Sequence, residues 1–149
     1  MISLHNYKST PEDFERLGYD IFQAIIEQGG PAWDGYQAVC RYLDPETGRR
    51  CAVGQLLSEN SRLNTSRSTF SLDFYDIMYG EGLIPDYDSP IKVIDAIYVA
   101  QLIHDDAGGT YNLWNGIMQS AAKGHLNAEN PLTAAIARGA IKALSSSSS

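Results

Sequence analysis

The sequence predicts a mainly α-helical domain with one small β-hairpin (α+β), built as a compact bundle of about five helices. Apolar residues recur at helical spacing in several long segments, and proline follows a cap residue at the start of three of them. One turn signal separates two short strand-like runs. The chain has 149 residues, of which 44% are hydrophobic, so we expect residues 1–144 to form a single domain with its own core.

The first helix is predicted between Pro11 and the glycine pair Gly29-Gly30. Thr10 is a typical N-cap residue, and Pro11 suits the first helical position. The glycine pair ends the apolar pattern. Five apolar residues at helical spacing predict packing by one face: Phe14, Leu17, Ile21, Ile25 and Ile26.

The β-hairpin is predicted to pair residues 38–43 with residues 49–53. Asp44 is followed by a proline and then by Gly48, a pattern typical of a type I turn closed by a left-handed glycine. An isolated hairpin is only marginally stable in water, so we expect this one to dock on the helices.

Two hairpin registers remain open, with either Leu43 opposite Gly48 or Asp44 opposite Arg49. Strand side chains alternate with period two, so both registers predict the same inner face. This face contains four residues: Cys40, Tyr42, Cys51 and Val53. The two cysteines are therefore expected to be direct or diagonal neighbours.

A short helical turn over residues 54–59 and a polar loop over residues 60–69 are expected next. Ser71 is a candidate cap for a helix that ends at Tyr79. Ser89-Pro90 opens a longer helix that extends to Asp106. Apolar residues cover nearly its whole circumference, which predicts a central position in the bundle.

Two further helices complete the predicted bundle. Thr110 is the expected cap of a helix that runs to Gly124, and Asn130-Pro131 opens the last helix, with an apolar stripe that ends at Leu144. The remaining residues, Ser145–Ser149, form a low-complexity tail that we expect to be disordered or added during cloning.

The cysteines allow four interpretations. In the preferred one, both are small buried residues that behave as hydrophobic side chains. A reversible disulfide between Cys40 and Cys51 is the second. A zinc site is the third, although two more ligands would have to come from His5, His104 and His125. The fourth is a nucleophilic Cys51 thiol, activated by the helical turn that follows it.

His104-Asp105 is a candidate motif for a metal-dependent hydrolase, because histidine and aspartate are common metal ligands. The pair is unspecific, and a structural role is favoured. In that role His104 binds the last carbonyl groups of its helix, and Asp105 helps to fold the turn that follows. Trp114 is expected to pack on the same corner.

These motifs resemble those of a family of small uncharacterised proteins encoded by phages, prophages and plasmids. The similar elements are Cys40-x-Tyr42, the Cys-Ala-Val-Gly run from Cys51, and the Gln-x-x-His-Asp run that ends at Asp105, within residues 10–127. Arg50 stands where a lysine is usual, and Leu-Ser-Glu-Asn replaces Ile-Pro-Asp-Glu after the glycine strand. The resemblance implies a mobile genetic element and a role in host takeover or counter-defence.

The negative charge of the chain is concentrated in one segment. Residues 73–106 carry eight carboxylates and a single cation, Lys92, so their net charge of −7 equals that of the whole chain. Residues 38–70 carry a net charge of +2. This asymmetry fits an acidic face for a basic partner, as well as simple solubility. A basic stripe for phosphates is missing, so direct nucleic-acid binding is not expected.

The preferred hypothesis is a non-enzymatic phage protein that inhibits or redirects a host protein, such as a nucleic-acid-binding defence complex, in the manner of an anti-CRISPR inhibitor. Its partner-binding residues are expected within the acidic segment: Tyr75, Asp76, Tyr79, Glu81, Asp86, Tyr87 and Asp88. No catalytic residue, metal or cofactor is predicted. The sequence has neither a long apolar run nor a secretory signal, so we expect a protein of the host cytoplasm without membrane contact.

Two alternatives remain open. The first is a small metal- or thiol-dependent enzyme in which Cys40, Cys51 and His104 converge. The second is a structural or accessory subunit of a larger assembly. The sequence does not decide the oligomeric state.

Overall fold

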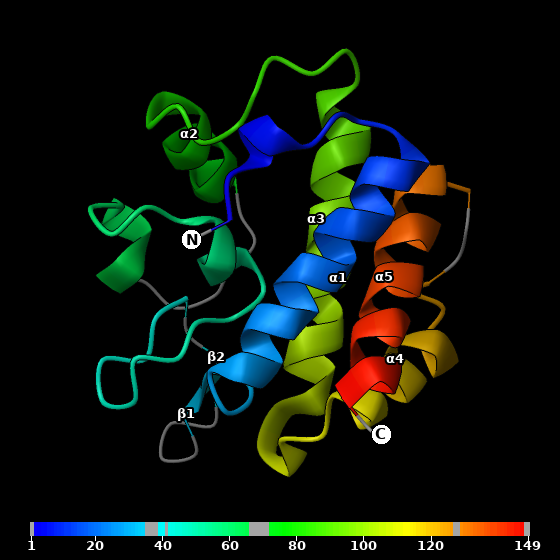
Figure 1. Cartoon of the computed structure of the whole chain (residues 1–149). Helices are drawn as coiled ribbons and strands as arrows, with labels where there is room; N and C mark the ends of the chain where they lie inside the picture. The colour runs from blue at the N-terminus through cyan, green and yellow to red at the C-terminus, as the bar shows by residue number, and fades with distance from the viewer. Residues whose placement is uncertain (1, 35–38, 41, 66–71, 127–128, 148–149) are drawn as a thin grey trace.

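The computed structural model describes residues 2–34, 39–40, 42–65, 72–126 and 129–147 (Figure 1). The predicted mainly helical bundle is confirmed, since these residues contain five α-helices. Their bounds are α1 Pro11–Glu27, α2 Leu72–Gly80, α3 Pro90–Ala107, α4 Leu113–Ala122 and α5 Pro131–Ser147. The described part also contains four 3-10 turns: η1 Leu4–Asn6, η2 Val53–Leu56, η3 Arg62–Thr65 and η4 Gly108–Thr110.

Helices α1 and α5 lie side by side and make the most extensive helix contact among the described residues (Figure 1). A glycine from each helix lets the two backbones touch. A Cβ atom on Gly139 would lie 2.0 Å from the carbonyl oxygen of Glu15, and one on Gly18 would lie 2.4 Å from that of Ile136. Arg138 and Lys142 hydrogen-bond the Glu15 carboxylate at 3.0 and 2.8 Å and lower its pKa.

Helix α3 has the predicted central position, because it packs on both α4 and α5 and also on η2. Buried residues line most of its circumference: Val93, Ala96, Ile97, Val99, Ala100, Gln101, Ile103, His104 and Ala107. Burial is not complete, however, since Ile91 and Tyr98 are exposed on one side. In Figure 1, α2, the 3-10 turns η1 to η3 and the short strands lie to the left of α3, whereas α4 and α5 lie to its right.

The helix caps agree with the prediction at two starts and differ at a third. Thr10 caps α1 by accepting a hydrogen bond from the Asp13 N–H, and Asn130 accepts one from the Leu132 N–H at the start of α5. Helix α4 is capped by Asn112, and the predicted cap Thr110 is part of η4. Its hydroxyl donates to the Ala107 carbonyl and so closes the end of α3.

The predicted hairpin over residues 38–43 and 49–53 is wrong. The turn forms as expected, with Gly48 at φ 76° and a Leu43–Arg50 bridge that matches the Asp44–Arg49 register. The pairing stops there, because the Cys51 carbonyl accepts the Gln55 N–H and the chain coils into η2. Strand β2, Val39–Cys40, instead pairs antiparallel with β1, Trp33–Asp34.

Two other expectations need comment. Helix α5 continues to Ser147 and thus includes part of the predicted serine tail. The proposed cap Ser71 and residues 66–69 of the polar loop lie outside the described residues, but residues 62–65 of that loop form η3. Of the helices described, none combines the length and the apolar character needed to cross a membrane.

Candidate functional site

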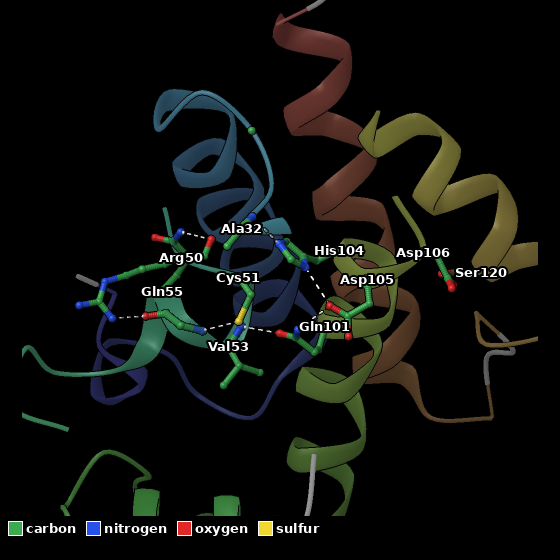
Figure 2. Close-up of polar contacts among 12 residues, drawn as sticks. Ala32, Arg50, Cys51, Val53, Gln55, Gln101, His104, Asp105, Asp106 and Ser120 are labelled. Atoms are coloured by element: carbon green, nitrogen blue, oxygen red, sulfur yellow. Dashed lines mark hydrogen bonds and ion pairs between the residues drawn. The ribbon is translucent and has the colours of Figure 1, made fainter. Parts of the chain in front are cut away.

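The Cys-Ala-Val-Gly run and the Gln-x-x-His-Asp run meet in a buried polar network, which we call the motif network (Figure 2). Its members are Gln28, Ala32, Arg50, Cys51, Val53, Gly54, Gln55, Gln101, His104 and Asp105. The direct link is a 3.0 Å hydrogen bond from the Val53 N–H to Oε1 of Gln101. Gln101 therefore joins the Cys-Ala-Val-Gly run to the central helix α3.

His104 is completely buried and uses both ring nitrogens inside the protein. Its Nε2 accepts the Ala32 N–H at 3.0 Å, so in the neutral ring Nδ1 carries the proton and donates to Oδ1 of Asp105 at 2.9 Å. The expected bonds from His104 to the last carbonyls of its helix are not formed. With both nitrogens occupied and the side chain fully buried, the ring is poorly placed to act as a general base.

Cys51 is a free, fully buried thiol whose sulfur accepts the Gly54 N–H at 3.3 Å. Burial raises its pKa from the usual 9.0 to about 12, and the hydrogen bond from Gly54 only partly opposes this shift. The thiolate needed for nucleophilic attack is therefore scarce near neutral pH. This geometry favours the interpretation of Cys51 as a small core residue.

Gln28, at the C-terminal end of α1, binds the backbone of Arg50 as a neighbouring strand would. Its Oε1 accepts the Arg50 N–H at 2.9 Å, and its Nε2 donates to the Arg50 carbonyl at 2.7 Å. Gln55 adds hydrogen bonds to Gln28 and to the same carbonyl. These amides satisfy the backbone at the entry to η2, where the expected β-ladder is absent.

Gly54 allows η2 to approach Tyr42 closely. A Cβ atom at this position would lie 2.0 Å from the Tyr42 carbonyl oxygen, far inside normal contact distance. Tyr42 itself is 1% exposed, and burial, together with the nearby Cys51 and Asp105, raises its pKa. The glycine of the Cys-Ala-Val-Gly run is thus explained by packing.

The enzyme hypothesis required Cys40, Cys51 and His104 to converge. Cys51 and His104 both belong to the motif network, but the side chain of Cys40 lies outside the described part. Its backbone pairs with Trp33. Across the described side chains there is no group of three or more histidine, cysteine or acidic residues arranged to hold a metal ion.

Asp106 forms a second polar cluster on the other side of the α3 end (Figure 2). It accepts hydrogen bonds from the Ser120 hydroxyl at 2.6 Å and from the Lys123 ammonium at 2.7 Å, and the His125 ring lies 3.6 Å away. Ser120 donates directly to the carboxylate and not to the histidine, so this is not the order of a catalytic triad. The cluster ties α4 to α3.

The residues predicted to bind a partner fall into two groups. Asp76, Tyr79, Asp86 and Asp88 are exposed, and we call them the acidic surface. Glu81 instead pairs with Arg62 at 3.8 Å, and the Tyr87 hydroxyl lies 2.9 Å from the carbonyl oxygens of both Leu4 and Tyr7. The side chain of Tyr75 lies outside the described part.

Trp114 lies apart from the motif network, at the start of α4. It is 37% exposed and lines an open pocket of about 350 Å³ with Tyr111, Leu144 and the glycine pair that follows α1. Tyr111 has a left-handed backbone with φ 56°. The predicted packing of Trp114 on the His104 corner is therefore replaced by packing near the ends of α1 and α5.

Sequence reasoning missed Gln28, and it noted Gln101 only as part of the Gln-x-x-His-Asp run, without a role. Gln28 and Gln101 each bind backbone groups of distant residues, and neither belongs to a recognised catalytic pattern. One signal was present, since Gln101 is a polar residue on a helix that is apolar almost all round. A buried polar residue of that kind needs partners.

Comparison with known proteins assigns no family. No protein-family model, curated protein or solved structure matches this chain.

Proposed function

We propose that this protein is a non-enzymatic binding protein of a mobile genetic element that inhibits or redirects a host protein through the acidic surface. The observation that supports the proposal is the exposure of Asp76, Tyr79, Asp86 and Asp88 within the segment that holds the whole net charge. Exposed carboxylates and an exposed tyrosine suit recognition of a basic protein surface, because tyrosine contributes contact area and the carboxylates contribute charge complementarity.

The motif network supports a binding function over a catalytic one. Cys51 and His104, two of the three residues of the enzyme hypothesis, are buried and hydrogen-bonded inside the protein. The exposed groups of the acidic surface are carboxylates and a phenol, which supply charge and contact area for a partner. Binding is the chemistry that such a surface supports best.

The partner we propose is a host defence complex whose basic groove normally holds nucleic acid. Exposed carboxylates imitate the charge of a phosphate backbone and compete for the same lysine and arginine side chains. The resemblance to phage and prophage proteins favours the same role, with action in the host cytoplasm. This proposal predicts binding that weakens steeply as the salt concentration rises.

The experiment is capture of host proteins on the immobilised chain, with and without the double substitution Asp86→Lys and Asp88→Lys. Both residues are exposed, so the substitutions change the charge without disturbing the core. The matched control is Glu46→Lys with Glu129→Lys, which makes the same change of charge at exposed positions elsewhere. The captured proteins are identified by mass spectrometry.

We expect one stoichiometric host protein on the unchanged chain and on the control, and its loss from the Asp86 and Asp88 variant. Equal retention by both variants would contradict a role for the acidic surface. Capture of no stoichiometric protein under low-salt conditions would contradict the binding function itself.

A further inference from the structure

A stripe of exposed and half-buried residues runs along the outer side of α3. Its residues follow the alternating spacing of four and three that is typical of a helix–helix seam: Ile91, Asp95, Tyr98, Leu102 and Asp105. We call this set the α3 stripe. It covers nearly the full length of the central helix.

Exposure along the α3 stripe is high for apolar side chains. Ile91 is 75% exposed and Tyr98 is 40% exposed, while Leu102 is partly buried. Asp95 is exposed, and the side chain of Asp105 is 32% exposed. The opposite side of α3 is buried against the bundle, at residues such as Ala96, Ala100 and Ala107. The stripe is therefore a continuous outer face with apolar and acidic positions in a fixed order.

The motif network holds one carboxylate of this stripe in place. Oδ1 of Asp105 accepts hydrogen bonds from Nε2 of Gln101 at 2.7 Å and from Nδ1 of His104 at 2.9 Å (Figure 2). Both donors are buried residues of the same helix. Asp105 is thus oriented before any partner arrives, so a cation that pairs with it does not have to order the side chain.

The charge pattern restricts what fits on the stripe. The two carboxylates are ten residues apart, which is about 15 Å along a helix axis. Between and beside them lie the three apolar side chains of Ile91, Tyr98 and Leu102. A second helix laid along α3 would bury these apolar groups only if lysine or arginine met Asp95 and Asp105, because an unpaired buried charge is strongly unfavourable.

We infer that the α3 stripe is the docking site for a basic amphipathic α-helix of the partner protein. Apolar residues of that helix contact Ile91, Tyr98 and Leu102, and its lysine or arginine residues pair with Asp95 and Asp105. This inference rests on the proposed function, since it adds the secondary structure and side-chain pattern of the partner to the charge argued above. It also extends the binding face from the acidic surface onto the central helix.

The test uses synthetic fluorescein-labelled helical peptides and fluorescence anisotropy. Two peptides carry leucine and lysine in the order that matches the stripe, one for parallel and one for antiparallel docking, and a third has the same composition in scrambled order. The protein variants are Ile91→Asp and Asp95→Lys. Their matched controls are Met118→Asp, at a residue that is 65% exposed on α4, and Glu129→Lys.

We expect one patterned peptide to bind at least ten times more tightly than the scrambled one. Each stripe variant should weaken this binding about tenfold, and each control variant less than twofold. An Asp95→Lys protein should recover affinity for a peptide in which the facing lysine is replaced by glutamate. Equal binding of patterned and scrambled peptides would overturn the inference, as would equal effects of stripe and control variants.

The same variants separate this inference from the proposed function. A host protein that is lost by the Asp86 and Asp88 variant but kept by Ile91→Asp and Asp95→Lys would overturn the stripe and support the acidic surface. A patterned peptide that binds through the stripe, in a protein that captures no host partner, would support the stripe as a helix-binding site and overturn the proposed function.

Discussion

Cys51 illustrates at the scale of one residue how burial decides the chemistry of a side chain. In the folded chain burial raises the pKa of this thiol to about 12, whereas the usual pKa of an exposed thiol is 9.0. Above pH 9 the unfolded state therefore loses a proton that the folded state retains. The stabilising contribution of the neutral thiol is fully present below pH 9 and is lost as the pH rises toward 12.

We predict that Cys51→Ala makes the stability of the protein less sensitive to alkaline pH. Between pH 9 and pH 11 the free energy of unfolding of the wild type should fall more steeply than that of the variant, by up to about 1.4 kcal/mol per pH unit. Urea unfolding at several pH values measures both slopes. Buried tyrosines whose raised pKa does not depend on Cys51, such as Tyr87, contribute equally to both proteins. Identical slopes would show that Cys51 titrates as an exposed thiol.

The sequence predicted Cys51 better than it predicted His104. Burial of a cysteine follows from its general tendency to occupy cores, and no information about its neighbours is needed. One of the two hydrogen-bond partners of His104 is the Ala32 N–H, which is 72 positions away in the chain. Local sequence patterns do not predict a contact between residues so far apart in the chain. The assignment of His104 to the end of its own helix therefore failed.

At the scale of secondary-structure elements, the hairpin also shows that local sequence patterns do not predict contacts between distant residues. Its turn residues specified the turn itself, and the bridge between Leu43 and Arg50 has one of the two expected registers. The strand after Arg50 fails because backbone groups there find other partners, including the Gln101 side chain at Val53. Helices were predicted more reliably, because caps and apolar spacing are local signals. Thr10 and Pro11 located the start of α1 for this reason.

The contact between α1 and α5 depends on glycine, and Gly139→Ala tests it. In an ordinary helix alanine would be favoured over glycine by about 1 kcal/mol. Here we predict the opposite sign, a loss of about 1–3 kcal/mol of stability, because the new Cβ would lie 2.0 Å from the Glu15 carbonyl oxygen. Urea unfolding measures the change.

Gly80→Ala is the matched control for this comparison. Gly80 is the last residue of α2, and a Cβ atom there meets nothing within 4 Å. We expect its stability to stay within about 0.5 kcal/mol of the wild type. A neutral or stabilising Gly139→Ala would mean that α1 and α5 are farther apart than described.

At the scale of the whole molecule, the negative charge divides into internal and external parts. Glu81 and Asp106 are engaged by hydrogen bonds or ion pairs within the protein, whereas Asp76, Asp86, Asp88 and Asp95 are exposed. Asp105 belongs to both parts, because it is hydrogen-bonded inside the protein and its side chain is still 32% exposed. Composition alone revealed the surplus but not this division. The candidate surface is therefore smaller than the segment 73–106 suggested, and it includes apolar positions of α3 that charge counting does not detect.

Tyr87 connects the acidic segment to the N-terminal part of the fold. Its hydroxyl lies 2.9 Å from two carbonyl oxygens in residues 4–7, and its ring packs edge-on against Phe14. We predict that Tyr87→Phe lowers stability by about 1 kcal/mol, because a part-buried carbonyl loses its donor. Hydrogen exchange should increase in residues 2–8 and 83–88 and stay unchanged in α5.

Tyr111→Phe is the control for this substitution. Tyr111 is 47% exposed, and the structure assigns its hydroxyl no hydrogen bond within the described residues. Its removal should leave both stability and hydrogen exchange unchanged. If Tyr87→Phe behaved in the same way, the Tyr87 hydroxyl would be free to meet a partner, and Tyr87 would return to the binding residues.

The pairing of α1 with α5 also has a consequence for the order in which the protein is made. Helix α1 leaves the ribosome first among the five described helices, and the helix that covers it leaves last. Until residues 131–147 have been translated, α1 lacks its main partner, and part of its apolar face is open to chaperones or to aggregation. A chain that stopped before Pro131 would therefore lack α5 and would also leave exposed the face of α1 that α5 covers.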